Sequence, residues 1–175
     1  MRCPYCGVEL PDEAVVCPDC HLSLEDGKPM NWYRFLVGPG LWLAGFGVLI
    51  LGILTMVGVP YFLQGYAPGV IYDSFKPLVV MDFVYGLVLI ALAVLCIVTR
   101  FRLAAFQKKG PVMLYIVYAL IILASVAYSA VSGWVISGGK AQLFGLTELG
   151  SIAGMIAGVA LNVIYFNKRK HLYYR

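Results

Sequence analysis

The sequence predicts an all-α membrane protein, a four-helix transmembrane bundle preceded by a small N-terminal ribbon with four cysteines. Of the 175 residues, 61% are hydrophobic and only 13% are charged, whereas a soluble domain carries about 25% charged residues. Four long apolar segments follow residue 30, and four of the five cysteines lie in the first twenty residues. Composition therefore changes sharply near residue 30, which divides the chain in two.

The apolar segments have the length that membrane helices need. A hydrocarbon core of about 30 Å takes about 20 apolar residues in helical form. Spans are expected at about 38–59, 78–99, 112–131 and 147–166, with Pro60 closing the first and Pro111 in the first turn of the third. Four such segments leave almost no polar face for a soluble fold. We expect a ribbon at 1–26, a linker and interfacial segment at 27–37 and a membrane domain at 38–175.

Positive charges predict the orientation of the chain. With four spans, one side holds only Lys76 and Lys140, and the other side holds eleven basic residues: Arg2, Lys28, Arg34, Arg100, Arg102, Lys108, Lys109, Lys168, Arg169, Lys170 and Arg175. Loops rich in Lys and Arg stay in the cytoplasm, so both termini are expected there. Residues 1–30 lack the apolar core of a cleaved signal peptide. The prediction is a multi-pass protein of the cell (inner) membrane, with its first span serving as an uncleaved signal-anchor.

The four N-terminal cysteines form two matching pairs. Cys3 and Cys6 are separated by two residues, as are Cys17 and Cys20, and ten residues separate the pairs. Four soft thiolates in a tetrahedron favour zinc, so the spacing predicts one structural zinc ion. A rubredoxin-like iron site is the main alternative, and a redox Cys-x-x-Cys is a weaker one. The reducing cytosol keeps such thiols available for a metal.

The turns around the cysteines are expected to have positive φ angles. Gly7 follows Cys6 and takes such a conformation without strain. His21 follows Cys20, and His is among the non-glycine residues that adopt positive φ. The segment 9–12 is expected to turn between two short strands.

The ribbon has few apolar residues, so metal binding would supply its folding free energy, on the order of 10 kcal/mol. Few contacts are expected across the linker at 25–30. Loss of one cysteine is therefore expected to loosen the ribbon without unfolding the spans. Cys96, in the second span, is expected to be a core residue.

The opening residues resemble a known bacterial module. The sequence Cys-Pro-Tyr-Cys-Gly-Val-Glu-Leu-Pro-Asp-Glu-Ala-Val-Val-Cys-Pro-Asp-Cys-His, over about residues 1–24, is similar to the short zinc ribbon that many bacterial proteins carry at one end. That module usually has Gly where this chain has His21. The rest, most closely 161–172 and more weakly 99–103, resembles uncharacterised bacterial zinc-ribbon proteins with four membrane spans. This resemblance implies an architecture and zinc as the metal, and it supplies no mechanism.

Two acids and a glycine stripe stand out in the predicted spans. Asp82 and Glu148 lie early in the second and fourth spans, near helix N-termini that favour a carboxylate. Intramembrane acids are also candidates for binding an ion or a substrate. Gly150, Gly154, Gly158 and Asn162 recur every four residues, a pattern typical of close helix packing, either within the bundle or between protomers. The glycines of the first span (40, 45, 47 and 52) make it a candidate partner inside the bundle.

The expected function is non-enzymatic. The sequence has no nucleophile set or phosphate loop, and a four-thiolate site leaves no open metal position for catalysis. We expect an inner-membrane protein whose cytoplasmic ribbon is a platform for an unidentified protein partner, with a homo-oligomer as a candidate assembly. Its basic inner loops suit anionic headgroups of the bilayer, and no nucleic acid is expected. The alternatives are a small channel or transporter using Asp82 and Glu148, and, less favoured, a lipid-modifying enzyme.

Overall fold

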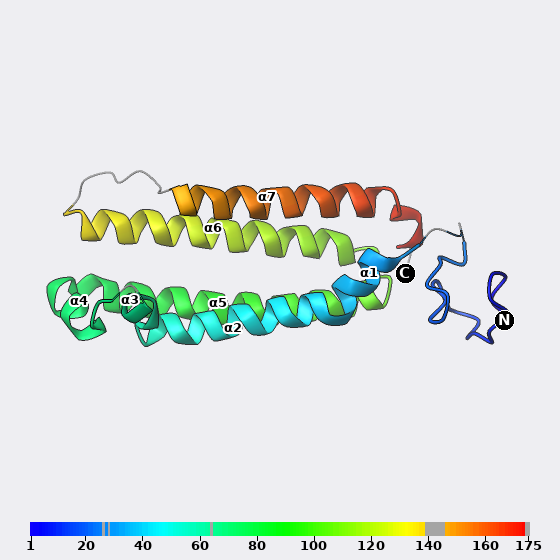
Figure 1. Ribbon diagram of the computed structural model, residues 1–175, viewed down its shortest axis with the longest axis horizontal. Helices are drawn as coiled ribbons and strands as arrows, with labels where there is room; N and C mark the ends of the chain where they lie inside the picture. Colours follow the sequence, from blue (N-terminus) through cyan, green and yellow to red (C-terminus); the bar gives the residue numbers. More distant parts are fainter. Residues whose placement is uncertain (26, 28, 64, 139–145, 174–175) are drawn as a thin grey trace.

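Long helices lie side by side along one axis in the computed structural model (Figure 1). The structure describes residues 1–25, 27, 29–63, 65–138 and 146–173, without the side chains of 146–149, 151 and 171. The main helices are α2 (Leu41–Met56), α5 (Lys76–Ala104), α6 (Gly110–Ile136) and α7 (Leu146–Asn167). The described residues contain isolated β-bridges and no strand. The predicted helical membrane bundle with an N-terminal cysteine ribbon is confirmed, and the ribbon's two expected strands are reduced to bridges.

The first span begins earlier than the sequence suggests. Helix α1 (Asn31–Phe35) runs through a π-helical turn, η1 (Leu36–Gly40), directly into α2. Pro39 lies inside this turn and has no N–H to donate, which is a common cause of such irregularities. The Leu41 N–H bonds to the Leu36 carbonyl, and the side chain of Arg100 donates from Nε to the Val37 carbonyl at 2.8 Å. A cation from the second span therefore supports the irregular turn in the first.

Three helical runs are long and apolar enough to cross a membrane: Asn31–Met56, Lys76–Ala104 and Gly110–Ile136. In the fourth predicted span, the described apolar part is the shorter run Ile152–Asn167. Gly58, with φ +76°, follows the end of the first run, so Pro60 lies beyond it in α3 (Val59–Leu63). Helix α4 (Pro68–Ser74) completes the loop that leads to α5. The chain ends return to the opposite end of the bundle from α3 and α4 (Figure 1), as an even number of spans requires.

Helices α2 and α5 are antiparallel and approach closely because small residues face each other. A Cβ added at Gly52 would lie 2.9 Å from the carbonyl oxygen of Gly86 and 3.1 Å from the Cβ of Leu89. Seven residues earlier on α2, a Cβ at Gly45 would lie 3.5 Å from the carbonyl oxygen of Ala93. Cys96 is buried beside this second contact, as expected for a core residue. The glycine face of the first span therefore packs against the second span.

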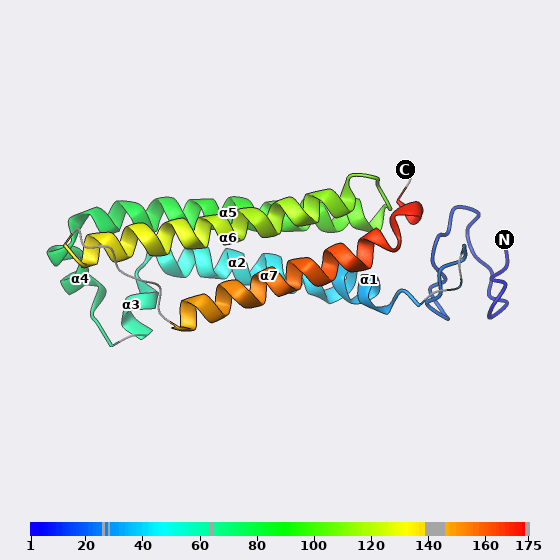
Figure 2. The same cartoon turned by 90° about the horizontal axis from the view of Figure 1, so that it is seen from above.

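The glycine stripe of α7 has no such partner. Helix α7 lies beside α6 and crosses the direction of the other helices obliquely (Figure 2). Among the described residues, no atom lies within 4 Å of a Cβ added at Gly150, Gly154 or Gly158. Asn162, at the end of the stripe, is buried and accepts a hydrogen bond from the Trp32 indole at 3.0 Å. The expected packing of the three glycines against the first span is absent from the described residues, because Gly45 and Gly52 of that span face α5.

An apolar core closes the end of the bundle where both termini lie. It joins one residue of the ribbon, Val15, to residues of the linker, four helices and the C-terminal segment: Met30, Tyr33, Leu36, Leu41, Leu103, Leu114, Phe166, Leu172 and Tyr173. The Tyr33 hydroxyl donates to the carbonyls of Leu103 and Ala104 at the end of α5, at 3.3 and 3.4 Å. The short helix η2 (Lys170–Leu172) brings the C-terminal segment into the same core.

The ribbon is therefore attached to the bundle by more than the chain itself. The Arg34 guanidinium donates to Nε2 of His21, and the Arg169 guanidinium donates to the Pro29 carbonyl at 3.3 Å. Together with the burial of Val15 in the bundle core, these contacts show that the prediction of few contacts across the linker is wrong. The sequence did not reveal them because the partners of Val15 lie far along the chain.

Gly52→Ala should destabilise the protomer by about 1–3 kcal/mol, the usual cost of overpacking, because the added methyl group meets backbone atoms of α5. Gly47→Ala is the matched control on the same helix, since nothing lies within 4 Å of a Cβ there and alanine is the better helix former. Thermal melting in one detergent compares the two. Equal midpoints for both variants would contradict the proposed close contact.

Candidate functional site

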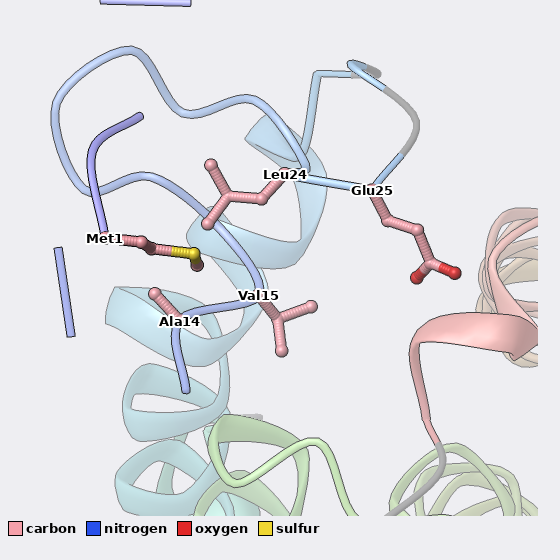
Figure 3. A pocket seen from close by; sticks show the side chains of 5 residues that line it. All are labelled: Met1, Ala14, Val15, Leu24 and Glu25. Carbon is pink, nitrogen blue, oxygen red and sulfur yellow. The ribbon is translucent and has the colours of Figure 1, made fainter. Parts of the chain in front are cut away.

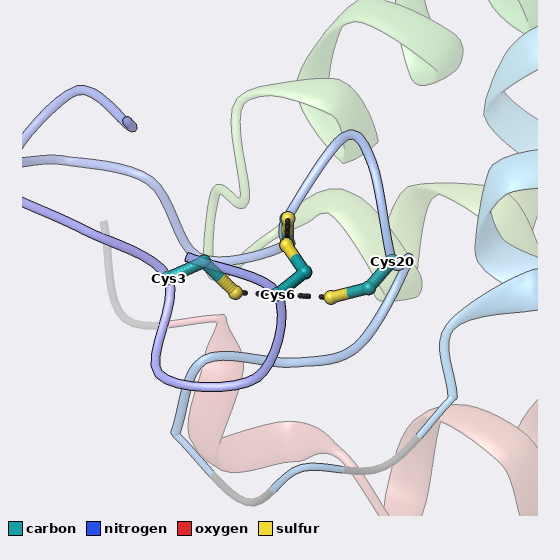
Figure 4. Close-up of side chains that lie close together, drawn as sticks. Cys3, Cys6 and Cys20 are labelled. Carbon is teal, nitrogen blue, oxygen red and sulfur yellow. Dashed lines mark hydrogen bonds between the residues drawn. The ribbon is translucent and has the colours of Figure 1, made fainter. Parts of the chain in front are cut away.

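The four predicted ligands come together in one cluster (Figure 4). The sulfurs of Cys3, Cys6, Cys17 and Cys20 all lie within 4.8 Å of one another. The Cys3 and Cys20 sulfurs are 3.7 Å apart, and those of Cys6 and Cys17 are 3.5 Å apart. Four sulfurs at about 2.3 Å from one tetrahedral ion lie about 3.8 Å from one another. The cluster therefore has the dimensions of a four-thiolate metal site.

Two similar turns hold the cysteines. In the first, the Gly7 N–H bonds to the Cys3 carbonyl and the Cys3 N–H bonds to the Val8 carbonyl, both at 2.9 Å. In the second, the His21 N–H bonds to the Cys17 carbonyl and the Cys17 N–H bonds to the Leu22 carbonyl, both at 3.1 Å. Gly7 has φ +78° and His21 has φ +60°. Both positive φ angles are confirmed, and each lets the chain reverse directly after its Cys-x-x-Cys pair.

The thiols do not all ionise readily by themselves. Burial raises the pKa of the Cys3 thiol, but hydrogen bonds with the backbone of Tyr5 and Cys6 outweigh it and lower the pKa to about 7. The backbone of Val8 lowers the pKa of Cys6, yet desolvation and the neighbouring sulfurs outweigh it and raise that pKa to about 12. Thiolates this close repel one another. A cation at their centre removes that repulsion, so the donor set suits a metal that prefers soft ligands.

Apolar contacts around the ligands are few. Cys3, Leu10 and Cys17 form a small buried group, with Ala14, Cys20 and Leu24 packed against it. A shallow cleft of about 360 Å³ beside this group is lined by Met1, Ala14, Val15, Leu24 and Glu25 (Figure 3). So small a core supplies little folding free energy, and a bound metal would supply much of the rest.

Cys17→Ser should abolish stoichiometric metal binding and also lower the melting midpoint of the membrane part, because loss of the ribbon fold releases Val15 from the bundle core. Cys96→Ala is the control, since Cys96 is buried between α2 and α5 and lies outside the cluster. Elemental analysis of purified protein and thermal melting measure the two effects. An unchanged midpoint in Cys17→Ser would show that the ribbon and the bundle are energetically independent.

The second predicted site, Asp82, has two tyrosine partners. Asp82 is completely buried in α5. Its Oδ2 accepts a hydrogen bond from Tyr72 of α4 at 2.9 Å, and its Oδ1 accepts one from Tyr128 of α6 at 2.7 Å. The Tyr128 ring stacks on Tyr85 with centroids 4.1 Å apart. The carboxylate therefore ties three helices together at the end of the bundle that holds α3 and α4.

Glu148 lies in α7, but its side chain is outside the described residues. A shared site of Asp82 and Glu148 therefore stays a prediction. Sequence reasoning did not find Tyr72 and Tyr128, which are 10 and 46 residues from Asp82. Both tyrosines carry a polar hydroxyl within an apolar segment, and this was the one feature of the sequence that could have identified them as partners of Asp82.

Comparison of the chain with protein-family models, with curated proteins and with solved structures finds no match.

Asp82→Ala should destabilise the protomer by about 2 kcal/mol or more, because it leaves two tyrosine hydroxyls without their acceptor. Asp82→Asn should cost less, since the amide keeps one acceptor oxygen. Tyr72→Phe and Tyr128→Phe each remove one donor and should fall between wild type and Asp82→Ala in a thermal melt. If all four variants melted like wild type, the three-helix junction would have no role in stability.

Proposed function

We propose that this protein is a non-enzymatic protein of the inner membrane whose zinc ribbon, on the cytoplasmic side, is a platform for contact with another protein. The observation that carries the proposal is that the second cysteine turn packs against the bundle, whereas the first cysteine turn lies away from it. Val15, just before the second turn, is buried in the bundle core, and His21 at its end is bonded to Arg34. The first turn lies at the far end of the molecule's long axis (Figure 1).

The first turn presents apolar side chains to the solvent. Tyr5 is 50% exposed and Val8 is 37% exposed, and both flank the ligand Cys6 in the sequence. Charged residues surround them, with Arg2 paired to Glu9 at 3.2 Å and Asp12 paired to the N-terminal amine at 2.8 Å. Exposed aromatic and aliphatic side chains within a charged rim are typical of the centre of a protein interface. A metal-tied turn would present them rigidly, which lowers the entropic cost of binding.

In this proposal, the membrane part anchors the ribbon to the bilayer. Homo-oligomerisation through the α7 stripe remains a proposal, and light scattering of Gly154→Leu tests it. A Cβ added at Gly154 meets no atom of another element within 4 Å among the described residues, so we expect the substitution to leave the protomer folded and to lower only the mass of an oligomer.

A channel or transporter is the second candidate, favoured by the buried carboxylate of Asp82 in a membrane-crossing helix. Flux into proteoliposomes that is lost in Asp82→Asn but kept in Tyr72→Phe, with both variants still folded, would favour it. Equal flux in the wild type and in Asp82→Asn would exclude a channel or transporter that uses Asp82.

The platform is tested with the double variant Tyr5→Ala/Val8→Ser. We expect it to keep its metal and its melting midpoint, and to lose the protein partners that wild type retains on affinity capture from detergent-solubilised membranes. Cys17→Ser should lose the same partners together with the metal. Asp19→Ala, at an exposed residue of the second turn, is the control and should keep them. An unchanged partner set in the double variant would refute the platform.

A further inference from the structure

A cleft of about 360 Å³ lies between the beginning of α6 and the end of α7. Among the described residues it is lined by the side chains of Lys108, Pro111, Val112, Tyr115, Phe166, Asn167, Lys170 and Tyr173. This is the end of the bundle where both chain termini lie (Figure 1). Val112 is 53% exposed, so the apolar side of the cleft opens toward the lipid-facing surface. The lysines lie on its polar side, just outside the helices.

Two tyrosines in this cleft have unpartnered hydroxyls. The Tyr115 and Tyr173 oxygens are buried and have no hydrogen-bond partner among the described residues. Tyr173 is only 5% exposed, and a buried hydroxyl without a partner is costly and uncommon in a folded protein. Burial also raises the pKa of Tyr173, so its hydroxyl stays neutral and available as a donor. The two oxygens indicate that a polar group completes this site.

The charge around the cleft favours an anion. Lys108 and Lys170 line it, and no Asp or Glu is among its described lining residues. Helix α6 begins at Gly110, so Pro111 and Val112 belong to its first turn, where the helix dipole is positive. Two ammonium groups, a helix N-terminus and hydroxyl donors together match the oxygens of a phosphate ester.

We propose that this cleft binds the phosphate headgroup of an anionic phospholipid, with the acyl chains running along the exposed face of α6. Lys108 and Lys170 contact the phosphate from the aqueous side, and Tyr173 donates to it from within. Pro111, Val112 and Phe166 contact the glycerol and the upper part of the chains. The lipid is distinguished from free phosphate by these apolar contacts. It is distinguished from a zwitterionic lipid by the two lysines, which meet no Asp or Glu among the described residues that line the cleft.

The test uses the purified full-length protein in detergent, titrated with dioleoyl phosphatidylglycerol, dioleoyl phosphatidylcholine or inorganic phosphate. Native mass spectrometry counts lipid adducts, and thermal melting reports stabilisation. We expect phosphatidylglycerol to bind at one saturable site and to raise the melting midpoint, and the other two probes to have little effect. Lys108→Gln/Lys170→Gln should weaken that binding about tenfold or more.

The matched control is Lys109→Gln/Lys168→Gln, which removes the same charge from neighbouring exposed positions that do not line the cleft. It should bind phosphatidylglycerol nearly as wild type does. Equal losses in both double variants would show a diffuse basic surface and overturn the site. Equal stabilisation by inorganic phosphate would overturn the lipid as the occupant.

Tyr173→Phe separates binding from folding. Without lipid it should melt at or above the wild-type midpoint, because it deletes an unpartnered buried hydroxyl and keeps the ring contacts with Phe106 and Phe166. It should weaken phosphatidylglycerol binding about tenfold, the usual effect of losing a hydrogen bond to a charged group. A lower midpoint without lipid, or unchanged lipid binding, would overturn the role assigned to Tyr173. Tyr115→Phe provides the same test at the second hydroxyl.

Discussion

The packing around Tyr33 connects the ribbon, the bundle and the C-terminal segment at one end of the molecule. Its hydroxyl bonds to the last carbonyls of α5, which lack intrahelical donors because the helix ends there. Its ring packs against Phe106 with centroids 4.9 Å apart, and its backbone N–H bonds to the Tyr165 hydroxyl of α7 at 3.3 Å. Val15 of the ribbon and Tyr173 of the C-terminal segment share the same buried core. The ribbon, the loop after α5 and the chain end therefore depend on one junction.

This shared core couples features that are separate in the sequence. The ribbon contributes Val15 to it, and the cleft between α6 and α7 contributes Phe166 and Tyr173. Phe106 packs on both Tyr33 and Tyr173, although its φ of +50° is unusual for an aromatic residue. Cores are close-packed and do not deform continuously. A change in the position of the ribbon would therefore alter the packing at Tyr173, which gives the proposed metal and the proposed lipid a physical route by which to influence each other.

Sequence reasoning succeeded where the signal is local and failed where it depends on distant partners. The cysteine cluster follows from spacing alone, and the positive φ of Gly7 and His21 follows from their place after each pair. The helices follow from length and composition. The tyrosine partners of Asp82 do not, because they depend on how the helices rotate about their axes, and the burial of Val15 does not, because its partners lie far along the chain. Helices that are apolar on all sides carry little information about that rotation.

The glycines show the same limit in physical terms. The four-residue spacing on α7 attracts attention because it matches the right-handed crossing of small-residue motifs, yet no described atom lies near it. The contact that brings two helices together uses a seven-residue spacing, with Gly45 near Ala93 and Gly52 near Gly86. Seven residues are about two turns, so both glycines lie on one face of α2, and this spacing is typical of left-handed crossings. In a membrane, where apolar side chains gain little by leaving lipid, the close backbone approach at such a seam supplies the dispersion contacts that favour helix pairing. The sequence alone does not show which of the two glycine spacings makes a close contact, because both place glycines on one face of a helix. The position of the partner helix decides which face is used.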